Sequence, residues 1–333
     1  MQAFVLTHYK QPLELRDVAE PVVGAHDVLV RVEAAGLNQL DEKIRLGEFT
    51  AILPYDLPQV LGHDVAGTVI RVGEQVRAFR IGDRVYGRPR KDQVGAFAER
   101  VAVAESDLAP IPDGLTTVEA GSLPLVALTA WQVLVERGDV QPGQKVLVHA
   151  GAGGVGSIAI QLAKHLGATV ATTASAANAD FVRSLGADVV IDHRREDFAA
   201  LLDGYDLVLD SLGGENLERS LRVLRPGGKA IGIAGPPDPA FARGAGLGAV
   251  VRLAVAALSR KVRSRAARLG VSYEFLFMHE SGAQLREVSA LVERGVIRPV
   301  VGATVPFAET AEALSAMGTG GVRGKTVVTF PVD

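Results

Sequence analysis

Six residues between a strand pattern and a helix pattern constrain this chain more than any other feature. Residues 151–156 read GAGGVG and place Gly151, Gly153 and Gly156 in the spacing G-x-G-x-x-G, directly after KVLVHA and directly before a helical run. In that context the first glycine permits a tight turn, the second lets a pyrophosphate approach, and the third lets helix and strand pack closely. The motif predicts a dinucleotide site that includes the helix-opening Gly154 and Val155. A purely structural glycine turn is the alternative.

The flanking sequence predicts the fold class. From KVLVHA onward, apolar strands alternate with helical patterns, which indicates an α/β fold with a doubly wound parallel sheet of the Rossmann type. The first third instead reads as short β-branched strands separated by Gly, Pro and Asp, typical of a compact β-domain. The last strands look more like the first domain than the second. We therefore expect one domain at residues 1–117 and 302–333, and a nucleotide-binding domain at 118–301 with an insertion at about 240–270.

Composition excludes several classes of protein. The 333 residues carry a formal charge of −3, which favours neither nucleic acid nor an anionic membrane at that level. Cysteine is absent, so there is neither a disulfide framework nor a thiolate metal site, and a reducing, cytoplasmic location fits. The N-terminus reads as a first strand, and the longest apolar stretches are short for a membrane span. We expect no membrane insertion and no nucleic-acid partner.

The end of the second strand bears on the choice of nucleotide. An NAD enzyme usually presents Asp or Glu there, but this strand continues TVATTASAANAD and offers Thr172, Thr173 and Ser175. Hydroxyl groups can donate to a 2′-phosphate that a carboxylate would repel, so we favour NADP(H) as the cofactor. His193 and Arg194, after the third strand, could add positive charge nearby. A solvated loop is the alternative for those two.

Taken together, GHDVAGTVIRVG, AGAGGVGSIAIQLAKHLGA and GGKAIGIAG resemble the medium-chain dehydrogenase/reductase superfamily over essentially the whole chain. GLNQLDEKIRLG, LPLVALTAWQ, SLGADVVIDH and RGKTVV resemble its zinc-independent quinone oxidoreductase and enone reductase branch. The resemblance implies a GroES-like catalytic domain, a Rossmann domain and an active site in the cleft between them. Two departures weaken the NADPH assignment: many members have Lys where Asn178 stands and Tyr where His193 stands.

The same resemblance bears on zinc. Zinc alcohol dehydrogenases carry a Cys in the segment that here contains Asn38, and a His–Glu pair where this chain has His63 and Asp64. SLPLVALTAW supplies no thiol where a later ligand would come. A catalytic zinc generally needs three protein ligands, so we expect no metal and interpret His63 as a structural residue in a turn.

Without a Lewis acid, a conjugated acceptor suits hydride transfer best, because donors near its oxygen can stabilise the resulting enolate. We therefore expect an NADPH-dependent enzyme that reduces a quinone or the C=C bond of an α,β-unsaturated carbonyl. The candidate catalytic residues are Asn38, Asp41, Lys43 and Tyr55. Three of these residues have a purely structural alternative: Lys43 as a solvated surface lysine, Asp41 as a helix cap and Tyr55 as a packed aromatic residue. Solvent could also supply the proton.

Further cofactor contacts follow from the resemblance and from the rule that ligands bind at the carboxyl ends of parallel strands. The cofactor-binding candidates besides the glycine turn are Thr129, Thr173, Ser175, Asn178, His193, Ile233, Ala234, Gly235 and Lys325. Thr129 could instead bond only its own helix backbone.

Residues 248–270 are apolar first and strongly basic second, and they fit no part of this scheme. The apolar half could cover the substrate cleft or bury in a dimer, and the basic half could bind an anion or simply be solvated. The resemblance suggests a homodimer. The alternatives to a quinone or enone reductase are a low-turnover NADPH-binding protein with a structural role and, less favoured, a zinc-type alcohol dehydrogenase.

Overall fold

The computed structural model describes residues 1–318 and 322–331, which divide into two compact units. Unit 1 comprises residues 1–128 and 279–333, and unit 2 comprises residues 129–278. The chain therefore leaves the first unit and returns to it. These boundaries differ from the predicted ones because α2 (Thr117–Gly121) packs on strands of unit 1, as does α11 (Gly282–Glu293).

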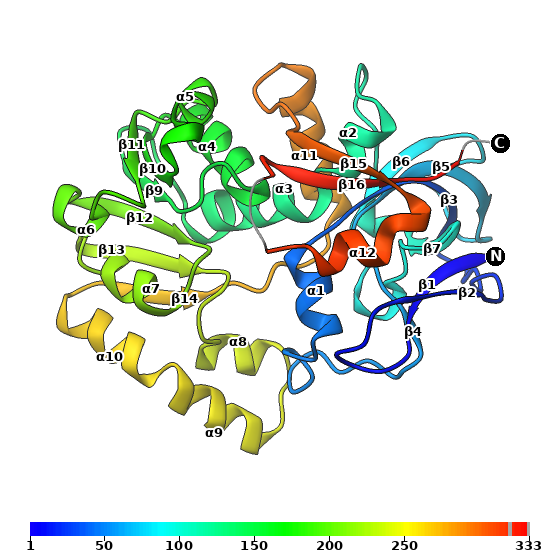
Figure 1. Cartoon of the computed structure of the whole chain (residues 1–333), viewed down its shortest axis with the longest axis horizontal. Helices are drawn as coiled ribbons and strands as arrows, with labels where there is room; N and C mark the ends of the chain where they lie inside the picture. The colour runs from blue at the N-terminus through cyan, green and yellow to red at the C-terminus, as the bar shows by residue number, and fades with distance from the viewer. Residues whose placement is uncertain (319–321, 332–333) are drawn as a thin grey trace. The chain divides into compact units, whose positions relative to one another are not determined.

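Unit 2 is built on a six-stranded parallel sheet with the order β11-β10-β9-β12-β13-β14, which can be followed in Figure 1. All five strand pairs are parallel, and the order reverses between β9 and β12. Right-handed crossovers on either side of that reversal place helices on both faces of the sheet. The strands are β9 (Lys145–Val148), β10 (Thr169–Ala174), β11 (Val189–Asp192), β12 (Tyr205–Asp210), β13 (Leu224–Gly232) and β14 (Ser272–Phe275).

The helices of unit 2 follow these strands in alternation, as a doubly wound fold requires. A core of buried side chains joins the sheet to α7 and α10, with Val208 of β12, Leu217 of α7 and Val262 of α10 among its members. The helices are α4 (Gly154–His165), α5 (Ala179–Ser184), α6 (Phe198–Leu201), α7 (Gly214–Ser220), α8 (Pro239–Gly244), α9 (Ala249–Leu258) and α10 (Arg260–Arg268). The fold class predicted for this part of the chain is confirmed.

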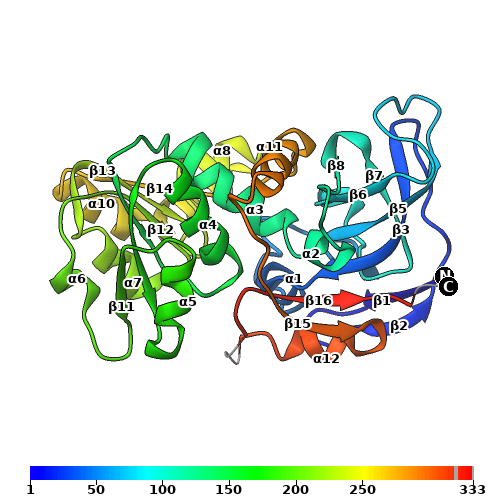
Figure 2. The ribbon, with the colours of Figure 1, turned by 90° about the horizontal axis from the view of Figure 1, so that it is seen from above.

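Unit 1 contains a seven-stranded and a three-stranded sheet (Figure 2). β16 pairs antiparallel with β3, with Val327 opposite Gly36, so the end of the chain completes the sheet that the first third begins. The larger sheet holds β3 (Asp27–Gly36), β5 (Val65–Val72), β6 (Arg84–Gly87), β7 (Arg100–Ala104), β8 (Leu108–Pro110), β15 (Val301–Pro306) and β16 (Lys325–Thr329). The smaller sheet holds β1 (Gln2–Leu6), β2 (Glu14–Asp17) and β4 (Gln59–Val60).

The remaining helices of unit 1 are α1 (Gln39–Arg45) and α12 (Thr310–Ser315), beside α2 and α11. The chain passes from unit 1 to unit 2 within α3 (Pro124–Trp131), which continues as a π-helix over Gln132–Arg137. No helix among the described residues is long and apolar enough to cross a membrane.

Candidate functional site

The glycine turn joins β9 to α4, and its three glycines differ in the space around them. A Cβ added at Gly151 would overlap Thr172 Oγ1, and one at Gly156 would overlap the carbonyl oxygen of Ala150. At Gly153 the nearest atom, again the Ala150 oxygen, is 3.3 Å away. Gly151 and Gly156 therefore serve the close packing of strand and helix, whereas Gly153 leaves its outer side open to a ligand.

The N-terminus of α4 adds hydrogen-bond donors to this open side. Gly153 is its N-cap residue and has no side chain to bond the first amides. The first intrahelical bond to Gly153 comes from Ser157 N at 2.9 Å. The amides before it, at Gly154, Val155 and Gly156, belong to the first turn, which has no acceptor within a helix. Together with the helix dipole they suit a pyrophosphate.

The hydroxyls of the two β10 threonines, Thr172 and Thr173, form hydrogen bonds within unit 2. Thr172 is fully buried and donates to Val148 O at 2.7 Å. Thr173 is 3% exposed, and its hydroxyl accepts from Ala150 N at 3.1 Å while lying 3.1 Å from His149 Nδ1. The Thr173 hydroxyl therefore stabilises the start of the glycine turn, and its contact with the cofactor stays a prediction.

The residues after β10 and β11 lie close together at the carboxyl edge of the sheet. His193 N donates to Ala174 O at 3.2 Å, which holds the turn after β11 beside the start of the segment containing Ser175. Ser175 and Asn178 are half-buried, and His193 and Arg194 are exposed. The structure thus places the segments that carry Ser175 and His193 side by side at the edge where the 2′-phosphate was expected.

The carboxyl ends of β12 and β13 hold the predicted residues Ile233, Ala234 and Gly235 and one residue, Asp210, that the sequence analysis missed. Ile233 N donates to Asp210 O at 2.9 Å, so the segment with Ala234 and Gly235 runs beside the end of β12. Asp210 is fully buried; its Oδ1 accepts from Gly213 N at 2.6 Å, but Oδ2 has no partner among the described residues. Burial raises the pKa of Asp210 to about 6. The only sequence signal was an acidic residue closing an apolar strand.

His149, which follows β9, is the second missed residue. It is 1% exposed, with Nε2 2.8 Å from Ser220 Oγ and Nδ1 facing Thr173. Burial lowers its pKa to about 4, so the ring is neutral at neutral pH. His149 thereby links β9 to β10 and α7 beneath the glycine turn.

In unit 1, four polar side chains interlock around Asn38. Asn38 Nδ2 donates to Asp64 Oδ2 at 2.9 Å and to Gly36 O at 3.2 Å, and Asn38 Oδ1 accepts from Lys325 Nζ. Its backbone N donates to Asp41 Oδ2 at 3.1 Å, which starts α1. Both amide hydrogens of Asn38 are thus used within the protein. For Asn38 to donate to a substrate, one of these two bonds would have to break, and its catalytic role stays a prediction.

Lys325 and Asp64 complete this network. Lys325 Nζ donates to Leu37 O at 2.6 Å and to Asp64 Oδ2 at 3.1 Å, in addition to Asn38. Asp64 Oδ1 accepts from Leu125 N at 2.7 Å. An ammonium group has three N–H bonds, and all three have acceptors here. Direct contact of Lys325 with a cofactor, which the sequence predicted, would require one of these bonds to break.

Asp41 and His63 form a second buried pair. Asp41 Oδ1 lies 2.6 Å from His63 Nδ1, and both side chains are 0% exposed. His63 Nε2 is buried without a partner among the described residues. Asp41 therefore orients His63 and caps α1, which is the alternative role that the sequence left open, and its catalytic role stays a prediction. In the described part of the chain, no group of three or more His, Cys, Asp and Glu residues has the spacing of a metal site.

Tyr55, Arg88 and Lys43 retain polar atoms that this network does not use. Tyr55 Oη and Arg88 Nε are buried without partners among the described residues, while Arg88 Nη1 donates to Glu280 Oε2 at 2.8 Å. Burial raises the pKa of the Tyr55 phenol, and the charges of Arg88 and Asp41 act on it in opposite directions. Lys43 is 39% exposed, and its Nζ lies 3.5 Å from Glu48. Thr129, the first residue of unit 2, is 3% exposed.

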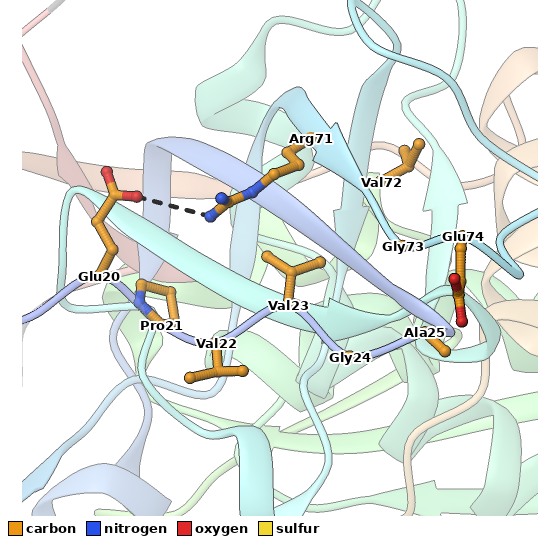
Figure 3. A pocket seen from close by; sticks show the side chains of 10 residues that line it. All are labelled: Glu20, Pro21, Val22, Val23, Gly24, Ala25, Arg71, Val72, Gly73 and Glu74. Carbon is orange, nitrogen blue, oxygen red and sulfur yellow. Dashed lines mark ion pairs between the residues drawn. The ribbon is translucent and has the colours of Figure 1, made fainter.

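A surface hollow of unit 1 lies elsewhere. It has a volume of about 630 Å³ and is lined by residues 20–25 and 71–74, with Arg71 3.6 Å from Glu20 (Figure 3). None of the candidate residues lines it.

Comparison with known proteins agrees with this geometry. Residues 24–113 match the alcohol dehydrogenase GroES-like domain family, and residues 185–328 match the zinc-binding dehydrogenase family. A tomato (Solanum lycopersicum) 2-methylene-furan-3-one reductase is 35% identical over 98% of this chain and 79% of its own. An Arabidopsis thaliana chloroplastic NADPH-dependent alkenal/one oxidoreductase is 35% identical over 100% of this chain and 80% of its own.

Among solved structures, the quinone oxidoreductase of Coxiella burnetii superposes with a TM-score of 0.86 and 31% identity, over 99% of both chains. The predicted GroES-like and Rossmann architecture is confirmed by these matches. The chain belongs to the medium-chain dehydrogenase/reductase superfamily, in its zinc-independent quinone and enone reductase branch.

Proposed function

We propose that this protein is an NADP(H)-dependent oxidoreductase that transfers hydride to a quinone or to the C=C bond of an α,β-unsaturated carbonyl without a metal. The observation that carries the proposal is the glycine turn: Gly153 has an open outer side beside the uncapped amides of α4, in a chain of this branch. The tomato, Arabidopsis and Coxiella proteins are named for such reductions.

The cofactor side of the proposal uses the carboxyl edge of the unit 2 sheet. The pyrophosphate would be held by the glycine turn, at Gly153, Gly154, Val155 and Gly156. The nicotinamide ribose would lie close to Ile233, Ala234 and Gly235. Ser175, Asn178 and His193 would meet the 2′-phosphate, with Arg194 nearby. Two of these positions depart from the pattern of many members, but Ser175, and not a carboxylate, stands directly after β10, where an acid would take the ribose hydroxyls of NAD. These assignments favour NADP(H).

The acceptor side uses unit 1. The bound nicotinamide would supply the hydride, which adds to the conjugated carbon of the acceptor while an electron pair moves to its oxygen. A donor near that oxygen stabilises the negative charge, and a proton then completes the reduction. Tyr55 suits this role because its O–H is unused and its raised pKa keeps it protonated. Lys43, an exposed cation, is the second candidate.

Asn38 and Asp41 have supporting roles in this proposal. They hold α1, and with it Lys43, against β5 and β16 through Asp64, His63 and Lys325. Asp64 is already bonded by an ammonium, an amide side chain and a backbone N–H. A carboxylate satisfied in this way supports a reaction that needs no metal there.

The test is the fall in NADPH absorbance when the purified protein is mixed with quinones, enones and simple ketones in turn. We expect oxidation with at least one quinone or enone and none with simple ketones. Oxidation only with simple ketones would contradict the chemistry, and oxidation with none of them would favour a low-turnover binding protein. A homodimer and a cytoplasmic location remain proposals, to be checked by light scattering and by fractionation of cells.

A further inference from the structure

The segment around α8, α9 and α10 is strongly basic, although the whole chain carries a small negative charge. Residues 239–273 contain seven Lys and Arg residues and no Asp or Glu, whereas the formal charge of the whole protein is −3. The basic residues are Arg243, Arg252, Arg260, Lys261, Arg263, Arg265 and Arg268. A stretch of 35 residues with one sign of charge makes a local field that net charge does not reveal.

α9 exposes an apolar face where a surface helix normally buries one. Val250 is 83% exposed, Leu253 is 74% exposed and Leu258 is 64% exposed. With Ala254 and Ala257, which are also exposed, they occupy positions i, i+3, i+4, i+7 and i+8, which is one stripe of the helix. α9 packs instead through Val255, which is 6% exposed, and its neighbours are α8 and α10.

α10 continues from α9 along the margin of unit 2, as Figure 1 shows, and turns a basic face outward. Its apolar residues Val262 and Ala266 are buried in the core, while Arg260, Lys261 and Arg268 are exposed. Lys261 and Arg265 share Glu218 of α7, at 2.5 and 3.0 Å. Arg252, Arg260 and Arg268 make no ion pair with the described residues.

We propose that α9 and α10 bind the surface of an anionic lipid bilayer, with the α9 stripe among the acyl chains and the α10 cations at the headgroups. An apolar stripe bordered by unpaired cations is the pattern of an interfacial helix. α9 has ten residues, too few to span a bilayer, so it lies in the membrane plane. This inference is independent of the reaction proposed above.

Two observations favour a bilayer over a second copy of the chain. A two-fold interface sets the same patch against itself, so a dimer through α9 and α10 would bring the unpaired cations Arg252, Arg260 and Arg268 of both copies together. The exposed stripe is also a ridge on a single helix, to which a fluid bilayer conforms without a complementary groove.

The experiment is flotation of the full-length protein with phosphatidylcholine vesicles, with and without phosphatidylglycerol. We expect binding only to the anionic vesicles, and weaker binding at high salt. Leu253→Asp with Leu258→Asp should weaken it more than about 100-fold, because each buried leucine contributes about tenfold or more. Arg252→Gln with Arg260→Gln should weaken it about 25-fold, at about fivefold per cation.

Matched controls change the same residue types elsewhere. Val22→Asp with Ile81→Asp alters side chains that are 89% and 67% exposed in unit 1, and Arg80→Gln with Arg195→Gln alters cations that are 90% and 82% exposed. Both controls should bind vesicles as the unaltered protein does, and all variants should keep its melting temperature. Absence of vesicle binding, equal binding to neutral vesicles, or equal losses in the controls would overturn the proposal. A dimer that becomes a monomer on Leu253→Asp would assign the stripe to a second copy instead.

Discussion

The two units bury polar groups near their candidate sites, but they use them in opposite ways. In unit 2 the buried groups, His149, Thr173 and Ser220, bond one another beneath the glycine turn and leave the amides of α4 open. In unit 1 the candidate residues themselves, Asn38, Asp41, Asp64 and Lys325, are the buried network. A binding site built from backbone is therefore visible in the glycine spacing, whereas one built from side chains depends on which of them remain unsatisfied.

The most direct test of this contrast is a substitution at Lys325, where we expect the largest loss of stability. Lys325→Met would leave the Asp64 carboxylate buried without its cation, and loss of one partner of a buried pair costs about 3–5 kcal/mol. The free energy of unfolding in urea, followed by circular dichroism, measures this. Lys91→Met, which changes an exposed lysine, should have little effect. A double-mutant cycle with Asp64→Asn should show that the two losses are not additive, and simple additivity would contradict the network.

Unit 2 offers a test by pH, because His149 and Asp210 titrate in opposite senses. The unfolded carboxyl of Asp210 loses its proton near 3.8 and the folded one near 6, so its contribution to stability falls as the pH rises through that window. The folded pKa of His149, about 4, lies below its ordinary 6.5, so its contribution rises with pH between those values. Each amounts to about 3 kcal/mol, since one pKa unit is about 1.4 kcal/mol.

These two slopes should nearly cancel in the unaltered protein. In Asp210→Asn only the histidine slope remains, so the free energy of unfolding should fall by about 3 kcal/mol between pH 6.5 and pH 4, relative to the unaltered protein. Urea unfolding at several pH values gives the comparison. Parallel pH profiles for the variant and the unaltered protein would show that Asp210 does not titrate in this window.

In unit 1, Tyr55→Phe tests whether the unsatisfied hydroxyl of Tyr55 takes part in the reaction. The Tyr55 hydroxyl has no partner among the described residues, so its removal should leave the melting temperature unchanged or slightly raised. If the hydroxyl donates to the acceptor oxygen, kcat should fall about 100-fold, the lower end for a positioned acid. Steady-state kinetics with the preferred quinone or enone decides. An unchanged kcat would assign proton delivery to solvent or to Lys43.

Sequence alone predicted the parts of the molecule that depend on spacing and chain order. The doubly wound sheet, the glycine turn and the β-rich first unit follow from apolar runs and from Gly151, Gly153 and Gly156. The satisfied state of Asn38 could not be predicted, because its partner Lys325 lies 287 residues away. Asp210 was missed for another reason: a carboxyl at the end of a strand can point inward or outward, and the sequence does not show which. The exposure of the apolar stripe of α9 could not be predicted either, because an exposed stripe and a buried one have the same helical periodicity.

The smallest expected effect separates the three glycines of the turn. Gly153→Ala adds a Cβ 3.3 Å from the Ala150 carbonyl oxygen, a tight contact that a small shift can relieve, so stability should fall less than in Gly156→Ala, but the methyl group stands where the pyrophosphate would approach. We expect NADPH to bind about tenfold more weakly, which is about 1.4 kcal/mol, measured by calorimetry. Gly244→Ala, which has open space around it, should bind NADPH normally. Gly156→Ala should instead lower stability, because its Cβ overlaps the Ala150 carbonyl. If Gly153→Ala loses stability and keeps its affinity, the turn is structural and the dinucleotide lies elsewhere.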